Sequence, residues 1–484
     1  MTAPVPIRDL IGPVVADLAR RSGTDLARWL DQVDRLRGCR EPIRLTGETM
    51  TVDAGTGELL HHYTTEHEPH GQLMVRCGNR RASRCPACAE TYRADTYHLI
   101  KAGLIGGAKG VPEHVRDHPR VFATLTAPSF GPVHTGPVHT GPVHTGPVHT
   151  GPDRHEARAG KGRVCHPRRT GPACWRRHSA GDPAIGQPID PDSYDYTGHV
   201  LWHAHAGDLW ARFTIYLRRA LARRAGLTHA AFNRTARVAF AKVAEYQQRA
   251  TVHFHAVIRI DGRPTPGTDQ QANTGPCPPP AWATSELLEA AIREAAAAVH
   301  LDAPDAGDAT PRTLTWGDQV DVRAITGTDM GGDLTEQAVA GYIAKYATKA
   351  AETTGTLDRP VNGWDLAHLE TRGLTPHTAA LIRTCWKLGA RPELAHLRLR
   401  KWAHMLGFRG HFSTKSRTYS TTLGALRQTR ADYAETARRD HLNLPAPDTT
   451  LVLAHWQYAG QGYTQGEAVL AGLPAPETRD GRTT

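Results

Sequence analysis

The sequence lacks any stretch approaching the ~20 consecutive apolar residues that a membrane-spanning helix needs. Its first residues, 1–19, carry Arg8, Asp9 and Asp17 inside their apolar stretch, which is not typical of a signal peptide. We therefore expect a cytoplasmic protein without a membrane partner. A Gly-x4-Gly-Lys-Ser/Thr phosphate-binding loop is also missing, which excludes an NTPase motor of that type.

Cysteine and acidic residues are in short supply. The 484 residues include eight cysteines, and cytoplasmic cysteines are expected to be reduced thiols or metal ligands rather than a disulfide framework. Acidic residues number 48 against 58 basic ones, which gives a formal net charge of +10 and a pI near 9.3. This balance favours a polyanionic partner such as nucleic acid.

The clearest metal signal is a cysteine knuckle. Cys85 and Cys88 are separated by two residues and Cys77 lies just upstream, a spacing that fits adjacent vertices of a tetrahedral zinc site. The fourth ligand is open between Cys39, His98 and His70. We choose Cys39, the nearest cysteine in sequence, and predict a structural zinc ion. The alternative is a set of cytoplasmic thiols without metal.

A second metal signal lies on the most regular predicted strand, residues 251–261. Strand alternation puts His253 and His255 on one face, where two imidazoles can bind one divalent ion. If the preceding strand, 237–247, pairs with it as a hairpin, Glu245 becomes the third ligand. Two imidazoles and a carboxylate with open positions suit Mn²⁺ or Mg²⁺ engaging a phosphate oxygen. The alternative is a half-buried polar face without metal.

Two tyrosines are spaced for one face of a helix. Tyr342 and Tyr346 stand four residues apart, and each is followed three residues later by a lysine, Lys345 or Lys349. A nearby cation favours the phenolate, and a divalent ion that polarises a phosphate would let such a phenolate attack it. The alternative is an aromatic stripe in the core of an amphipathic helix. We expect Asp333 to begin the helix as a capping box with Glu336.

A repeat interrupts the middle of the chain. After a predicted strand at 121–127, the pentapeptide Gly-Pro-Val-His-Thr occurs four times between Gly131 and Thr150. The repeat places four histidines at a period of five: His134, His139, His144 and His149. We interpret this segment as a tandem expansion in a surface loop rather than a metal site. A basic loop at 153–195 follows, and the sequence leaves undecided whether Cys165 and Cys174 in it bind a second metal.

Three motifs together resemble a known family. His253-Phe254-His255 resembles the His-hydrophobe-His motif of HUH endonucleases. The segment Phe122–Thr126 resembles the first motif of rolling-circle replication initiators, and Tyr342–Lys349 resembles the double-tyrosine third motif. Their order along the chain is the order in that family. Around the motifs, the chain resembles actinomycete plasmid replication initiators of the RepSA type.

The resemblance implies an α+β fold with an HUH/RRM-like central antiparallel sheet flanked by helices. We expect a zinc-knuckle region before this sheet and a helical region after it. The expected domains are a zinc-binding region (1–110), a nuclease domain carrying the repeat insertion at 131–150 (111–360), a basic helical DNA-contact region (361–430) and a partly disordered tail (431–484).

The activity implied is origin binding, site-specific nicking of one DNA strand, covalent 5′ attachment through tyrosine, and rejoining. Tyr346 or Tyr342 would be the nucleophile, with preference for Tyr346, and Lys345 and Lys349 would orient phosphate or phenolate. We expect DNA contacts from Thr124, Thr126, Arg259, Arg409, Lys415 and Arg417. Host helicase and polymerase would be partners, and the origin would be single-stranded at the nick. The alternatives are a non-catalytic zinc-containing DNA-binding or regulatory protein, and a relaxase or transposase with the same chemistry.

Overall fold

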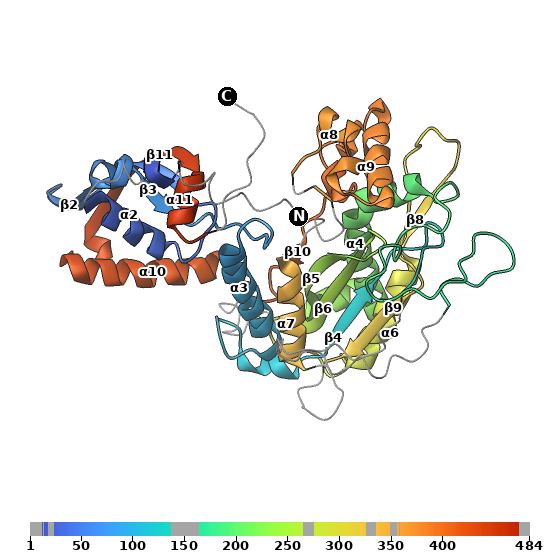
Figure 1. The fold of residues 1–484 in the computed structure, drawn as a ribbon. Coiled ribbons are helices and arrows are strands. Elements are labelled where there is room, and N and C mark those ends of the chain that lie inside the picture. Colours follow the sequence, from blue (N-terminus) through green and yellow to red (C-terminus); the bar gives the residue numbers. More distant parts are fainter. Residues whose placement is uncertain are drawn as a thin grey trace, which may run out of the picture. The chain divides into compact units, whose positions relative to one another are not determined.

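The chain folds into two compact units (Figure 1). The computed structural model describes residues 12, 14–17, 24–136, 164–264, 275–325, 335–348, 356–357 and 359–473. One unit combines Met1–Asp95 with Thr422–Thr484, and the other is Thr96–Thr421. Within these described ranges, no helix combines the length and apolar character that crossing a membrane requires. Mixed helices and antiparallel sheets confirm the predicted α+β class.

The first unit is built on a small antiparallel sheet in the order β11-β1-β2, with β3 also paired to β1. Trp29 and Leu36 pack with Tyr463 and Ala468 beside this sheet, and the core they form includes three of the cysteines. The elements of this unit are α2 (Thr24–Arg35), β1 (Ile43–Asp53), β2 (Leu59–Thr64), β3 (Leu73–Val75), α10 (Leu423–Leu442), β11 (Thr450–Gln461) and α11 (Gln465–Leu470). Helix α3 (Pro86–Ile105) continues from this unit into the second.

The C-terminal segment differs from the tail that we expected at 431–484. Strand β11 pairs antiparallel with β1 along its whole length, from Asp53↔Thr450 to Ile43↔Gln461. Residues 474–484 lie outside the described part of the chain. A strand pair whose members are about 400 residues apart in sequence leaves no local signature, because the alternation of one strand does not reveal its partner.

The second unit contains a larger antiparallel sheet. Among the described residues, five strands form it in the order β10-β5-β6-β4-β9, with β6 in the centre (Figure 1). Its strands are β4 (Arg120–Leu125), β5 (Ala236–Tyr246), β6 (Val252–Gly262), β9 (Val320–Ala324) and β10 (Ser413–Lys415). The other elements are α4 (Tyr196–Arg224), α5 (His229–Thr235), α6 (Ser285–Ala298), β7 (His300–Asp302), β8 (Thr313–Thr315), α7 (Glu336–Ala347), α8 (Gly363–Ala367) and α9 (Pro376–Leu388).

The two faces of this sheet have different partners. Phe254, Ala256 and Ile258 of β6 are buried in the main core with residues of α4, α6 and α9, and the Trp210 ring of α4 lies 5.8 Å from that of Phe254. The side chains between them point to the opposite face, as strand alternation requires. Helix α7 packs against β5 on the sheet, and it carries both tyrosines.

Two helix boundaries depart from the sequence-based expectation. Helix α7 begins after Thr335, whose hydroxyl accepts a hydrogen bond from the Ala338 amide, and Asp333 lies outside the described residues. In the region 361–430, which we expected to be helical, helix α9 ends at Leu388. The chain continues as two short 3₁₀ turns, each followed by a residue with positive φ, because Pro392 and these left-handed residues interrupt an α-helix.

Candidate active site

Glu245, His253 and His255 converge at one end of the central strands. Antiparallel pairing of β5 with β6 sets Glu245 directly opposite His253. Glu245 Oε2 lies 3.2 Å from His253 Nε2 and 3.1 Å from His255 Nε2, and the two Nε2 atoms are 3.1 Å apart. The structure therefore brings together the three residues that the hairpin interpretation predicted.

Strand β4 orients one of these imidazoles. Thr124 is paired with His255 across the β4–β6 ladder, and Thr124 Oγ1 lies 3.0 Å from His255 Nδ1. When Nδ1–H donates to this hydroxyl, the Nε2 lone pair points at Glu245 and can bind a cation. The Phe122 ring stacks on His255, with centroids 5.6 Å apart and planes 6° from parallel, and so fixes the ring plane.

Burial sets the charge of the cluster. It lowers the pKa of His255 to about 4, so that this imidazole is neutral at neutral pH and can serve as a ligand. Burial alone would raise the pKa of Glu245, but its interactions with His253 and His255 outweigh burial and lower this pKa to about 2. The site therefore presents one carboxylate and two imidazoles, a ligand set suited to a divalent cation.

The tyrosines of α7 face this cluster. Tyr342 Oη lies 3.0 Å from His255 Nε2 and 3.4 Å from Glu245 Oε2. The Tyr346 ring lies 4.6 Å from that of Tyr342 and 6.2 Å from that of His255. Tyr342 and Tyr346 are both half-buried, so the expected shared helical face is directed into the cluster rather than into a closed core.

The two phenols differ in their surroundings. Burial and the nearby Glu245 charge raise both pKa values, that of Tyr346 to about 12 and that of Tyr342 still further. Lys345 is exposed, and its Nζ lies 5.6 Å from the centre of the Tyr346 ring. Lys349, expected to assist in the same way, lies outside the described residues.

The four cysteines near the N-terminus form a separate cluster in the first unit. Cys39, Cys77, Cys85 and Cys88 place their sulfurs within 4.8 Å of one another, which confirms Cys39 over His98 and His70 as the fourth member. The sulfurs of Cys39 and Cys85 are 3.8 Å apart, the separation of about 3.8 Å expected for two thiolates on a tetrahedral zinc ion. The amide of Cys77 donates to the Cys39 sulfur, and that of Arg40 donates to Cys85. These residues can hold zinc.

Comparison with known proteins decides the family. The family model described as RepSA, replication initiator protein of pSAM2, matches residues 25–475. The chain belongs to this family. A replication initiator protein of Streptomyces ambofaciens is 50% identical over 478 residues, which cover 97% of this chain and 94% of the relative. No solved structure matches the chain. The predicted resemblance to replication initiators of the RepSA type is thereby confirmed.

One predicted DNA contact of this RepSA initiator is wrong. Arg259 is fully buried, and its guanidinium binds both carboxylate oxygens of Asp261, at 2.6 and 3.0 Å, together with the carbonyls of Gly103 and Tyr419. It shares a strand face with His253, but other parts of the second unit cover that face at the far end of β6. Arg259 is a structural residue, and a buried arginine paired in this way is not available to phosphate.

Of the other predicted DNA contacts in the initiator, three make hydrogen bonds within the fold and one is exposed. Thr126 donates to the Gln319 carbonyl at 2.8 Å, and Arg409 donates to the Ala204 carbonyl at 2.9 Å, so both make contacts within the fold. Lys415 is half-buried, and its ammonium donates to the Ser420 carbonyl at 2.9 Å. Arg417 is exposed.

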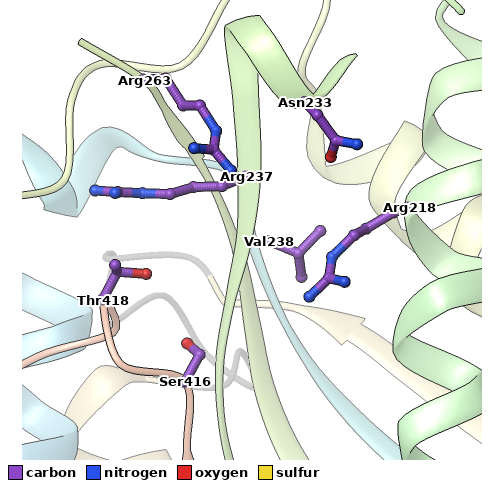
Figure 2. Close-up of a pocket in the computed structure, with 7 residues that line it drawn as sticks. All are labelled: Arg218, Asn233, Arg237, Val238, Arg263, Ser416 and Thr418. Atoms are coloured by element: carbon purple, nitrogen blue, oxygen red, sulfur yellow. The ribbon is translucent and has the colours of Figure 1, made fainter. Parts of the chain in front are cut away.

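A basic pocket that the sequence did not reveal lies at the start of β5. It has a volume of about 380 Å³ and is lined by Arg218, Asn233, Arg237, Val238, Arg263, Ser416 and Thr418. Figure 2 shows the three arginines that line this pocket: Arg218 on α4, Arg237 on β5 and Arg263 just after β6. Arg237 precedes Glu245 by eight residues, or about 26 Å of strand. The pocket is therefore distinct from the Glu245 cluster, and its charge suits phosphate.

One histidine of the repeat, which we interpreted as part of a surface loop rather than a metal site, lies in a cluster of possible ligands. His134, from the first Gly-Pro-Val-His-Thr unit of the RepSA initiator, lies with Cys165, Cys174 and His178, and their ligand atoms are within 4.8 Å of one another. His139, His144 and His149 lie outside the described residues. The sequence left open a second metal at Cys165 and Cys174, but it did not point to His134, because His134 lies 31 positions before Cys165.

Proposed function

We propose that this replication initiator is an HUH-type nicking-joining endonuclease that cuts one strand of plasmid origin DNA through a tyrosine nucleophile and rejoins the ends. The observation that carries the proposal is the position of the Tyr342 hydroxyl, 3.0 Å from His255 Nε2 within the Glu245–His253–His255 cluster. A phenol held against a divalent-ion ligand set, in a protein family that initiates replication, suits phosphoryl transfer to tyrosine. The antiparallel order β10-β5-β6-β4-β9 supports the HUH/RRM-like description.

The ligand set fits Mg²⁺ or Mn²⁺. Adjacent ligands at about 2.1 Å from an octahedral ion lie about 3 Å apart, and the three separations in the cluster are 3.1–3.2 Å. Glu245, His253 and His255 would hold the ion on one side and leave its other positions open. A bound divalent ion would polarise the scissile phosphate and neutralise the charge that develops on it.

In the nicking step, a tyrosine Oη attacks the phosphorus, the bond from phosphorus to the 3′ oxygen breaks, and that oxygen takes a proton to become a free 3′-OH. The phenol proton leaves to solvent or to a base, and the 5′ phosphate stays on the tyrosine. Joining is the reverse attack by a 3′-OH. The phosphotyrosine bond conserves the energy of the cleaved bond, so joining needs no nucleotide cofactor.

We assign the first attack to Tyr346 and a second, alternating attack to Tyr342. The pKa of Tyr346 is raised less than that of Tyr342, and the Lys345 ammonium lies near its ring, so its phenolate forms more readily. Lys345 would orient the phosphate or stabilise the phenolate, and we propose the same for Lys349. Two phenols on one helical face can transfer a strand between them without releasing it.

Origin DNA would contact basic surfaces of the second unit. Arg417 and the pocket lined by Arg218, Arg237 and Arg263 are our candidates for phosphate contacts. The four-cysteine cluster would hold a structural zinc ion. Because the sequence has no phosphate-binding loop of the Walker type, strand separation would depend on a host helicase, and extension of the 3′-OH on a host polymerase.

The test uses the full-length protein, Mn²⁺ or Mg²⁺, and single-stranded oligonucleotides tiled across the origin of its plasmid. We expect one cleavage site, a free 3′-OH, and a phosphotyrosyl peptide that mass spectrometry assigns to residues 341–348. Tyr346→Phe should lose nicking, Tyr342→Phe should keep nicking and lose strand transfer, and the matched control Tyr216→Phe on α4 should behave as wild type.

Two results would overturn the proposal. Nicking by the Tyr342→Phe/Tyr346→Phe double variant would exclude the tyrosine mechanism. Origin binding that survives EDTA, without cleavage under any divalent metal, would favour the non-catalytic DNA-binding alternative. An adduct on Tyr342 instead of Tyr346 would keep the mechanism and reverse the order of the two attacks.

A further inference from the structure

The second cysteine-histidine cluster has the geometry of a closed metal site. We propose that His134, Cys165, Cys174 and His178 bind a second, structural zinc ion, and that the first Gly-Pro-Val-His-Thr unit thereby supplies a zinc ligand. The cluster lies on the segment between β4 and α4, within the second unit, and it shares no residue with the Glu245 cluster or with the four-cysteine cluster.

The distances between ligand atoms match a tetrahedron around zinc. For Zn–S bonds of about 2.3 Å and Zn–N bonds of about 2.05 Å, tetrahedral geometry gives S···N separations of about 3.5 Å and an N···N separation of about 3.3 Å. The Cys165 sulfur lies 3.8 Å from His134 Nδ1, and the Cys174 sulfur lies 3.4 Å from His178 Nε2. His134 Nδ1 and His178 Nε2 are 3.2 Å apart.

Groups around the cluster orient the ligands as they do in metal sites. His178 Nδ1 lies 2.7 Å from Asp182 Oδ2, so that Nδ1–H donates to the carboxylate and the Nε2 lone pair points into the cluster. A carboxylate behind a zinc-binding histidine fixes the tautomer and raises the basicity of the ligand. On the other side, the Thr135 amide donates to the Cys165 sulfur at 3.1 Å, which stabilises a thiolate.

The segment has almost no core of its own. From 164 to 193, the buried residues are Cys165, Cys174, His178, Gly186 and Pro188. No large apolar side chain in this part of the described chain is buried, so the hydrophobic effect contributes little to fixing it. Three of these five buried residues are the proposed ligands themselves. A zinc ion, whose binding contributes directly to folding, would supply the missing stabilisation.

The ligands tie three stretches of chain together. A short antiparallel bridge between His166 and Cys174 brings the chain around the two cysteines together, and their sulfurs lie in the same cluster. The backbone of His134 is held separately, since its amide donates to the Gln187 carbonyl and its carbonyl accepts from the Gly186 amide, both at 2.8 Å. Both the amide and the carbonyl of His134 therefore hold the first repeat unit in the fold. A repeat without a structural role would not require these contacts.

The experiment measures zinc in the purified full-length protein, dialysed against excess Mg²⁺ and a weak zinc chelator so that the open Glu245 cluster does not retain zinc. We expect two zinc ions per chain, and X-ray absorption at the zinc edge should give an average of three sulfurs and one nitrogen per zinc. One zinc per chain with four sulfur neighbours would overturn the proposal. This wild-type measurement does not depend on whether any variant folds.

Variants locate the second ion. Cys165→Ser/Cys174→Ser should hold one zinc instead of two, whereas the matched control His166→Ala, next to Cys165 but outside the cluster, should hold two. The triple variant His139→Ala/His144→Ala/His149→Ala should keep two zinc ions. Adding His134→Ala to the triple variant should weaken the second site at least ~10-fold in competition with a chromogenic chelator. Equal zinc retention by the triple and quadruple variants would remove His134 from the site.

Discussion

The Glu245–His253–His255 cluster and the four-cysteine cluster differ in ligand type and spacing, and the difference suits two kinds of metal site. The four sulfurs enclose a point, with the Cys39 and Cys85 sulfurs 3.8 Å apart, as a closed tetrahedral zinc site requires. The carboxylate and imidazoles lie 3.1–3.2 Å apart and occupy one side of their site, with phenols on the other. The closed arrangement of sulfurs suits a structural ion, and the open arrangement suits an ion that binds a reacting phosphate.

Exposure differs for part of each cluster, while Cys77 is partly exposed and His255 is buried. Cys39 and Cys85 are fully buried, whereas the side chains of Glu245 and His253 are 18% and 13% exposed. A metal that must meet a phosphate needs open positions, and a metal that holds two loops together does not. We therefore expect the Glu245 site to exchange its ion readily and the cysteine site to retain its ion.

The largest expected effect comes from breaking the open site. His255→Ala removes a central ligand and should lower the nicking rate by at least about 1000-fold, because the charge that develops on the phosphate is no longer neutralised. Denaturing electrophoresis of a labelled origin oligonucleotide measures the rate. The zinc content and the melting temperature should stay close to wild type. Loss of zinc from this variant would mean that the two sites are not independent.

The corresponding change in the four-cysteine cluster is Cys85→Ser. A structural site that loses one thiolate should lose its ion, and the unit that contains it should unfold at lower temperature, because zinc binding contributes to folding. Elemental analysis should show one zinc fewer per chain, and hydrogen exchange should rise in residues 24–95. Nicking of a single-stranded oligonucleotide should persist, since every proposed catalytic residue lies in 96–421. Unchanged zinc content would contradict the four-cysteine assignment.

Local periodicity explains what the sequence predicted about these sites. Alternation on β6 gave His253 and His255 a common face, hairpin pairing added Glu245, and the four-residue spacing directed both tyrosines of α7 to one side. Each inference depends on neighbours in sequence or on one short turn. For this reason the convergence of Glu245, His253 and His255, and the shared face of the two tyrosines, could be predicted before the fold was known.

Contacts between distant segments explain what the sequence did not predict. Arg259 obeys the same alternation as His253, yet it is buried, because the cover over its end of β6 comes from residues around Gly103 and Tyr419. Strand β11 pairs with β1 across most of the chain length, and His134 meets Cys165 across a repeat. Periodicity identifies a face of an element, but it does not identify what covers that face.

A smaller effect is expected from a change that alters only how the His255 imidazole is oriented in the Glu245 cluster. Thr124→Val keeps the shape of the side chain but removes the hydrogen bond to His255 Nδ1, which should weaken divalent-ion binding at the open site by about 10- to 100-fold. The Mn²⁺ concentration that gives half-maximal nicking measures this effect. Thr126→Val, two residues further along the same face and bonded to Gln319, is the matched control. An equal shift in both variants would point to strand stability rather than to ligand orientation.

The smallest expected effect concerns DNA binding rather than either metal. Arg417 is exposed, and if it contacts one phosphate, Arg417→Ala should reduce the slope of log affinity against log salt by about 0.7 for single-stranded DNA, because one fewer counterion equivalent is released. Fluorescence anisotropy between 50 and 300 mM salt measures the slope. The metal dependence of nicking should not change, since Arg417 is no part of the ligand set. Arg259→Lys should instead lower the melting temperature and leave the slope unchanged, because its guanidinium bonds are made inside the fold.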